Sequence, residues 1–195
     1  MRKQLTKDEI DLFRADTYLI LANLFYETPA EKILKLLRSG NYSINTRDPW
    51  VECWAELVNE TRKHNEKAIK KEFHKLFIGV NRGELLPYAS WYLAGYLHEK
   101  PLMELRSELR SLGIKSSGTS PEPEDHISML CEAMSILIEN REAKQKLFFF
   151  KFISTWVNTF FEDVIRSQSS NFYRAVGSFG KKFILTEQQY LNIDN

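Results

Sequence analysis

The succession of helix start and stop signals is the feature that most constrains the fold of this 195-residue sequence. Thr6 to Glu9 has the pattern of a capping box, in which a hydroxyl and a carboxylate satisfy backbone N–H groups at a helix start. Apolar residues at helical spacing follow as far as Tyr26. A second helix is predicted from Thr28-Pro29 to Gly40, since proline suits the first helical turn and glycine the position after the last one.

The same spacing predicts helices through the rest of the chain. They cover 48–58, 65–77, 88–97, 101–113, 123–139, 143–167, 171–182 and 187–191. No run of residues alternates with the two-residue period of a strand, so no sheet is expected. We therefore predict an all-α fold, a compact multi-helix bundle of about nine helices. Residues 114–121 are rich in turn formers and are the expected hinge between two halves of one domain that spans 1–195.

Composition and charge exclude several classes of protein. The net charge of +1 gives no overall attraction to nucleic acid or to an anionic membrane. Cys53 and Cys131 fit neither a disulfide framework nor a zinc site. Residues 4–11 are charged where a secretory signal needs an apolar run, and charges interrupt the most apolar segment, 147–165. We expect a cytoplasmic protein that binds no nucleic acid and has no stable membrane insertion.

Motifs of the common enzyme classes are missing from the sequence. A phosphate-binding loop needs two glycines and a Lys-Ser/Thr pair, whereas Ala175 and Lys182 stand at two of the required positions. There is neither a Gly-x-Ser-x-Gly elbow nor a His-Glu-x-x-His motif. The four histidines show no metal-ligand spacing among themselves. We predict that the chain is not an enzyme and has no resident cofactor or metal.

Two segments stand out as candidates for binding. Pro87 to Leu93 reads Pro-Tyr-Ala-Ser-Trp-Tyr-Leu, and on a helix its Tyr and Trp side chains share one face. Aromatic side chains with polar tips suit a surface that meets both a partner and water. A core helix whose hydroxyls find internal partners is the alternative. Pro121 to His126 presents three carboxylates, which either occupy the first turn of a helix, where the macrodipole favours them, or pair with a partner's arginine.

A third segment, Phe148 to Phe161, nearly encircles its predicted helix with large aromatic side chains. Such a helix normally lies in the core. We therefore interpret this segment as part of the hydrophobic core.

In this order, the segments resemble the TorD/DmsD family of cytoplasmic chaperones for molybdenum-containing redox enzymes. The matching pieces are Phe73–Gly79, Pro87–Leu93, Glu122–His126, the aromatic helix around Trp156, and Phe172-Tyr173. They span nearly the whole chain, and the Glu-Pro-x-Asp-His element at 122–126 is the most specific of them. The resemblance implies an all-helical fold of two halves joined by a hinge, here at 114–121.

The resemblance also implies a function. Such a chaperone binds the twin-arginine signal peptide of a molybdenum-cofactor redox enzyme precursor and holds the precursor back from export until its cofactor is inserted. The implied partner is therefore the precursor, through its leader, and the chain is expected as a monomer or a domain-swapped dimer. Some members of the family bind guanine nucleotides weakly, which we carry over only as a remote property.

Carried over residue by residue, the resemblance and the chemistry of arginine recognition define a candidate site. Carboxylates would receive the arginines, a histidine would orient them, and aromatic side chains would line the apolar part of the leader. The candidate signal-peptide-binding residues are Phe77, Tyr88, Ser90, Trp91, Tyr92, Glu122, Asp125 and His126. Three positions depart from the family pattern: Ala89 replaces an acidic residue, and Phe152 and Thr155 replace histidine and proline.

Two other functions stay open from the sequence. One is a weak nucleotide-binding hydrolase, which would retain nucleotide on purification. The other is a generic helical interaction protein or a nucleic-acid-binding protein, and the latter would bind DNA with a strong salt dependence.

Overall fold

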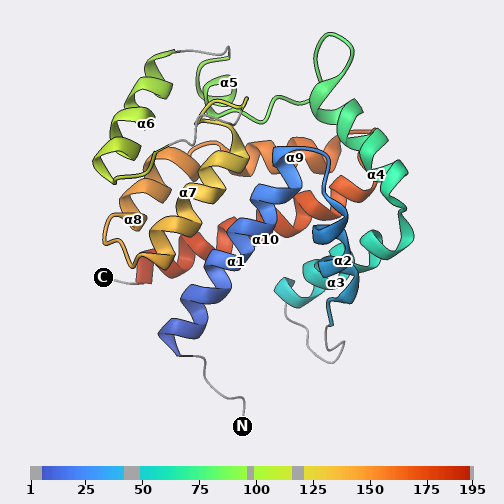
Figure 1. Cartoon of the computed structure of the whole chain (residues 1–195), viewed down its shortest axis with the longest axis horizontal. Helices are drawn as coiled ribbons and strands as arrows, with labels where there is room; N and C mark the ends of the chain where they lie inside the picture. The colour runs from blue at the N-terminus through green and yellow to red at the C-terminus, as the bar shows by residue number, and fades with distance from the viewer. Residues whose placement is uncertain (1–5, 42–48, 96–98, 116–120, 194–195) are drawn as a thin grey trace.

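Helices account for all the regular elements of the computed structural model, which describes residues 6–41, 49–95, 99–115 and 121–193 (Figure 1). They are α1 Lys7–Tyr26, α2 Glu31–Ser39, α3 Pro49–Lys63, α4 Glu66–Phe73, η1 His74–Ile78, α5 Ala89–Ala94, α6 Glu99–Ser111, α7 Ile127–Glu139, α8 Gln145–Phe148, η2 Phe149–Ile153, α9 Val157–Arg166 and α10 Phe172–Ile193. The elements η1 and η2 are single turns of π-helix. Within these ranges there is no strand, which confirms the predicted all-α class.

The longest helices, α1 and α10, run through the middle of the bundle (Figure 1). Helix α1 packs along α7, and α10 packs on α9 and α3. Close packing of α9 on α10 depends on Gly180, because a Cβ there would meet the ring of Phe161 at 2.4 Å. No described helix has the length and apolar character that crossing a bilayer requires.

Aromatic side chains join the helices in the core. The ring of Phe25 in α1 lies 5.5 Å from Phe77 of η1, 5.3 Å from Phe160 of α9 and 5.8 Å from Tyr173 of α10. Ring pairs at these separations add to the stabilisation that comes from burial alone. Trp156 is 2% exposed and Phe161 is fully buried, so the aromatic segment 148–161 belongs to the core, as predicted.

A buried ion pair ties the beginning of the chain to its end. Arg14 of α1 donates two hydrogen bonds to Glu187 of α10, at 2.8 and 2.7 Å, and both side chains are almost completely buried. The same guanidinium donates to Asp11 at 2.7 Å and to Gln145 of α8 at 2.8 Å. Burial alone would lower the pKa of Arg14, but the hydrogen bonds and charge of Glu187 outweigh it and raise that pKa above its ordinary value.

A second buried carboxylate, Glu72 of α4, forms the cap of α10. Its oxygens accept hydrogen bonds from the backbone N–H groups of Asn171 at 2.8 Å, Phe172 at 3.1 Å and Tyr173 at 2.7 Å. Helix starts leave these N–H groups without intrahelical partners. A side chain from another helix therefore holds α10 in place.

The structure differs from the sequence-based prediction in the C-terminal half. The predicted helix 143–167 is interrupted at 154–156, between η2 and α9. In η2 the hydrogen bond from Ser154 N reaches back to the carbonyl of Phe149, and the indole of Trp156 donates to the carbonyl of Phe152. These bonds satisfy carbonyls that an uninterrupted helix would pair with backbone N–H groups.

Two further boundaries were also predicted incorrectly. Helices predicted at 171–182 and 187–191 are one continuous helix, α10. Helix α7 begins at Ile127, so the carboxylates of residues 122–125 precede the helix and do not occupy its first turn. The hinge predicted at 114–121 falls mainly on 116–120, outside the described residues.

Candidate functional site

Helix α5 is held against the segment that precedes α7. Ala89 N donates to the carbonyl of Asp125 at 3.0 Å, and Ile127 N donates to the carbonyl of Pro87 at 2.9 Å. These bonds flank an isolated antiparallel bridge between Tyr88 and His126. The two segments that the sequence singled out as candidates, 87–93 and 121–126, therefore lie side by side.

Asp125 faces the interior. Its side chain is 3% exposed, and its Oδ2 accepts a hydrogen bond from the backbone N–H of Ser90 at 3.0 Å. Ser90 is equally buried, and its N–H lies in the first turn of α5, where no intrahelical acceptor is available. In this conformation the Asp125 carboxylate anchors α5 to the segment before α7.

His126 is the N-cap of α7 and is also buried. Its Nδ1 accepts from the backbone N–H of Ser128 at 3.2 Å and lies 2.6 Å from the Ser128 hydroxyl. The ring of Tyr88 packs edge-on against the imidazole at a centroid distance of 5.0 Å. Burial lowers the pKa of His126 to about 3, so the imidazole is neutral in the folded protein at physiological pH.

We expect acid to destabilise the fold through His126. In the unfolded chain the imidazole takes up a proton below pH ~6.5, whereas in the folded chain it stays neutral until about pH 3. Folding stability is therefore lost as the pH falls below ~6.5, by roughly 1.4 kcal/mol per pH unit. Between pH 7 and pH 5, the free energy of unfolding measured with urea should fall by about 2 kcal/mol more in the wild type than in His126→Asn. This variant keeps an N-capping side chain. Equal losses of unfolding free energy in the two proteins would show that His126 is not held neutral by burial in the folded state.

Tyr88 and Tyr92 each donate a hydrogen bond to a carboxylate. The hydroxyl of Tyr88 donates to Glu122 at 2.7 Å, and the hydroxyl of Tyr92 donates to Asp163 of α9 at 3.0 Å. Burial, then the nearby carboxylate, raises the pKa of each phenol above its ordinary value. We call Tyr88, Trp91, Tyr92, Glu122 and Asp163 the α5 surface, since all five side chains are partly exposed on or beside α5.

Arginines of the chain already contact this region. The guanidinium of Arg82 lies over the ring of Trp91 at 5.0 Å from its centroid. Arg106 of α6 donates to Glu124, beside Glu122, at 2.8 Å. Guanidinium groups stack on aromatic faces and form strong hydrogen bonds with carboxylates, and both kinds of contact occur here.

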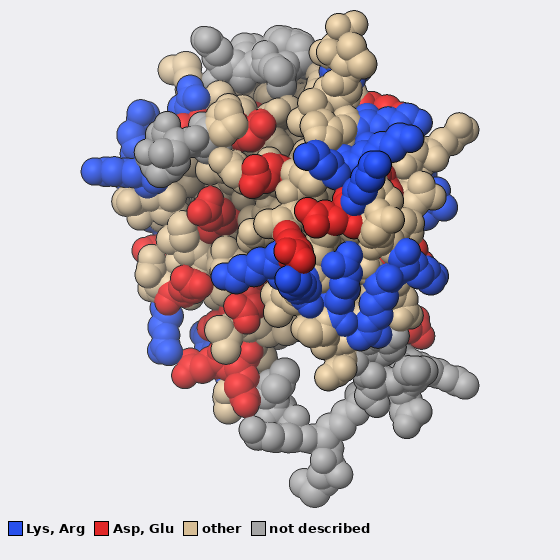
Figure 2. Space-filling view, turned by 45° about the vertical axis from the view of Figure 1, so that its right-hand side comes forward, with Lys and Arg blue, Asp and Glu red and all other residues tan. Residues whose placement is uncertain are grey.

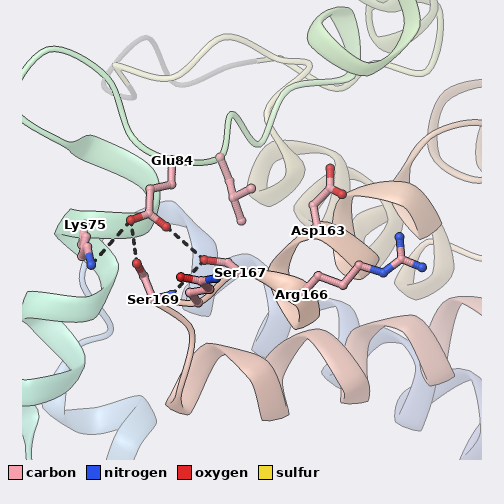
Figure 3. A pocket seen from close by; sticks show the side chains of 8 residues that line it. Lys75, Glu84, Asp163, Arg166, Ser167 and Ser169 are labelled. Carbon is pink, nitrogen blue, oxygen red and sulfur yellow. Dashed lines mark hydrogen bonds and ion pairs between the residues drawn. The ribbon is translucent and has the colours of Figure 1, made fainter.

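A hollow of about 700 Å³ adjoins the α5 surface. The residues that line it are Lys75, Glu84, Leu85, Asp163, Arg166, Ser167, Gln168 and Ser169. Figure 3 shows Lys75 and Glu84 on one side of it and Asp163 and Arg166 on the other. Hydrogen bonds from the hydroxyls of Ser169 at 2.6 Å and, to a smaller extent, Ser167 at 3.0 Å hold Glu84 in place and lower its pKa. None of these residues was a sequence-based candidate, because no local pattern marks them.

Phe77 lies in the core behind Tyr92, because the rings of both residues contact Phe160, at centroid distances of 6.5 and 6.0 Å. It is 8% exposed, and its ring packs against Tyr173 at 5.1 Å in the aromatic core. The structure thus brings Tyr88, Trp91, Tyr92 and Glu122 to the surface, while Phe77, like Ser90, Asp125 and His126, is buried.

Charge is unevenly distributed on the face shown in Figure 2, where Lys and Arg side chains gather on the right-hand part. Helix α4 contributes the exposed Lys67, Lys70 and Lys71. In the part of the chain that the structure describes, no three His, Cys, Asp or Glu side chains are close enough together to hold a metal ion.

Comparison with known proteins gives consistent results. A family model described as nitrate reductase delta subunit matches residues 45–162, more than half of the chain. The Haemophilus influenzae protein named probable Tat proofreading chaperone DmsD is 26% identical over 191 residues, covering 90% of each chain. The Vibrio parahaemolyticus chaperone protein TorD is 23% identical over 202 residues, covering 91% of this chain and 94% of its own.

A solved structure has the same fold. It is the crystal structure of a protein from Archaeoglobus fulgidus described as a redox enzyme maturation protein, with a TM-score of 0.64 and 19% identity. The alignment covers 95% of this chain and 98% of the archaeal one. The two curated relatives are named as chaperones and not as enzymes, in agreement with the sequence-based prediction. The chain thus belongs to the nitrate reductase delta subunit family and, within it, to the TorD/DmsD chaperones.

Proposed function

We propose that this chaperone acts in the cytoplasm and binds the twin-arginine signal peptide of a molybdenum-cofactor redox enzyme precursor, assisting its maturation before export. The observation that carries the proposal is the way in which the α5 region holds arginine. Arg82 stacks on Trp91, and Arg106 pairs with Glu124. A leader with two arginines offers the same chemical groups.

The leader's apolar stretch would meet exposed apolar side chains near the same helix. Leu93 at the end of α5 is 50% exposed, Ile78 at the end of η1 is 49% exposed, and Val80 in the following loop is fully exposed. Signal peptides place an apolar segment after their basic residues. Ile78 and Val80 belong to the same chain segment as Arg82, whose guanidinium lies over Trp91 of α5, so this segment reaches the α5 region.

Calorimetric titration with leader peptides from the redox enzyme precursors of the source genome tests the proposal. We expect micromolar binding of one leader, and binding about tenfold weaker when its two arginines are changed to lysines, which cannot form bidentate or stacked contacts. Glu122→Gln should weaken binding about as much, because the leader's arginine loses an ionised acceptor.

Glu139→Gln is the matched control, since Glu139 is an exposed acid at the end of α7, outside the α5 surface. It should leave the dissociation constant unchanged. The proposal is wrong if no leader binds the wild-type protein. It is also wrong if the lysine leader binds as tightly as the arginine one.

A further inference from the structure

The carboxylates near α5 differ in the hydrogen-bond and ion-pair partners that they already have. Asp125 is buried and bonded to α5, and Glu124 is paired with Arg106. Glu84 accepts from two hydroxyls and lies 3.7 Å from the ammonium of Lys75. Asp163 is different: within the described ranges no cation lies at ion-pair distance from it, and its hydrogen bond from the neutral hydroxyl of Tyr92 reaches one oxygen, Oδ2.

The position of Asp163 makes it accessible to a partner. It lines the hollow from α9, on the side opposite Glu84 (Figure 3). It is partly exposed, and Tyr92, which orients it, belongs to the α5 surface. A ligand on the α5 surface could therefore extend one side chain into the hollow without a change in the fold.

The chemistry of the hollow suits a guanidinium within a peptide. An ionised carboxylate has two oxygens and can accept two parallel N–H donors from arginine. Lys75 and Arg166 also line the hollow, but each is already paired with another carboxylate, Lys75 with Glu84 at 3.7 Å and Arg166 with Glu162 at 3.5 Å. The same two side chains can donate hydrogen bonds to carbonyl groups of a peptide backbone.

We infer that Asp163 receives one arginine side chain of the bound leader, with Tyr92 as the residue that positions its carboxylate. This inference rests on the proposed function and adds to it the residue that binds one arginine of the leader. This arginine-binding position, Asp163, lies on α9, outside the segments 87–93 and 121–126.

The test is a cycle of titrations with the twin-arginine leader peptides and with versions in which each arginine in turn is citrulline, its neutral isostere. Asp163→Asn keeps an oxygen acceptor for Tyr92 and removes the charge. We expect this variant to bind the arginine leader about tenfold more weakly. One of the two citrulline leaders should bind the wild type about tenfold more weakly, and Asp163→Asn should then cause no further loss with that leader.

Asp16→Asn is the control, since it makes the same change of charge at an exposed residue of α1 outside the hollow. It should leave every dissociation constant within about twofold. Tyr92→Phe provides an independent variant, because it removes the hydrogen bond and leaves the carboxylate charged. Tyr92→Phe should bind the arginine leader about threefold more weakly and still prefer arginine to citrulline, because the carboxylate keeps its charge but loses one hydrogen bond. An unchanged dissociation constant would show that Tyr92 does not position Asp163, and loss of the preference would count against Asp163 as the arginine acceptor.

Each contrary outcome identifies which idea fails. If the wild type binds a leader and Asp163→Asn binds it equally well, Asp163 does not receive an arginine of the leader, while the proposed function stands. The same conclusion follows if Asp163→Asn weakens both citrulline leaders as much as it weakens the arginine leader. If no leader binds the wild type, the proposed function fails and the inference fails with it.

Discussion

Replacing Arg14 with methionine should lower the free energy of unfolding by about 3–5 kcal/mol, because it leaves the carboxylate of Glu187 buried without its cation. Glu187 is 1% exposed and its remaining donor is the hydroxyl of Tyr18, at 3.4 Å. In a protein of this size such a loss lowers the melting temperature by roughly 10 °C. Urea unfolding followed by circular dichroism gives the free energy, and thermal unfolding gives the temperature.

Two further variants separate the buried pair from ordinary ion pairing. The double variant Arg14→Met with Glu187→Met should recover most of the lost stability, since apolar side chains of similar size replace a buried pair at little cost. Arg141→Met should cost less than ~1 kcal/mol, since its pair with Asp8 is exposed at 76% and 75%. If Arg14→Met and Arg141→Met lower the free energy of unfolding equally, burial of the Arg14–Glu187 pair does not add to the cost of breaking it.

How well the sequence predicted a helix depended on whether local or distant contacts define its ends. The capping box at the start of α1 is local: Thr6 N donates to the Glu9 carboxylate at 2.8 Å, and Glu9 N donates to the Thr6 hydroxyl at 3.2 Å. The predicted start and end of this helix are therefore correct. By contrast, the break before α9 lies at Trp156, a buried side chain whose neighbours belong to several helices. Local spacing carries no information about such surroundings.

The same distinction applies to the candidate site. The segments 87–93 and 121–126 carry conspicuous residues, so the sequence could mark them before their contact was known. Asp163 is an ordinary acid on an amphipathic helix, and its role depends on Tyr92, 71 positions earlier in the chain. Burial also could not be predicted from the motif: Asp125 and Glu122 stand close together in sequence, but only Glu122 is partly exposed. Their roles in binding a leader stay predictions.

Glu72→Gln should lower the free energy of unfolding by about 2–3 kcal/mol, the second largest effect that the structure predicts. The carboxylate of Glu72 accepts three backbone N–H groups at the start of α10, where the helix dipole also favours a negative charge. Glutamine has nearly the same shape, but it is neutral and turns an N–H₂ group toward these donors. Helix α10 should then fray from Asn171, and hydrogen exchange of the first-turn amides should become faster than in the wild type.

Glu66→Gln is the matched control, because Glu66 is exposed in the first turn of the same helix, α4. It should change stability by less than ~0.5 kcal/mol and leave the α10 amides protected. A loss confined to Glu72→Gln, together with faster exchange at the start of α10, would mean that α4 fixes the position of α10 through this one side chain. If both variants lose the same small amount, packing of the aromatic core alone holds α10, and the cap contributes little.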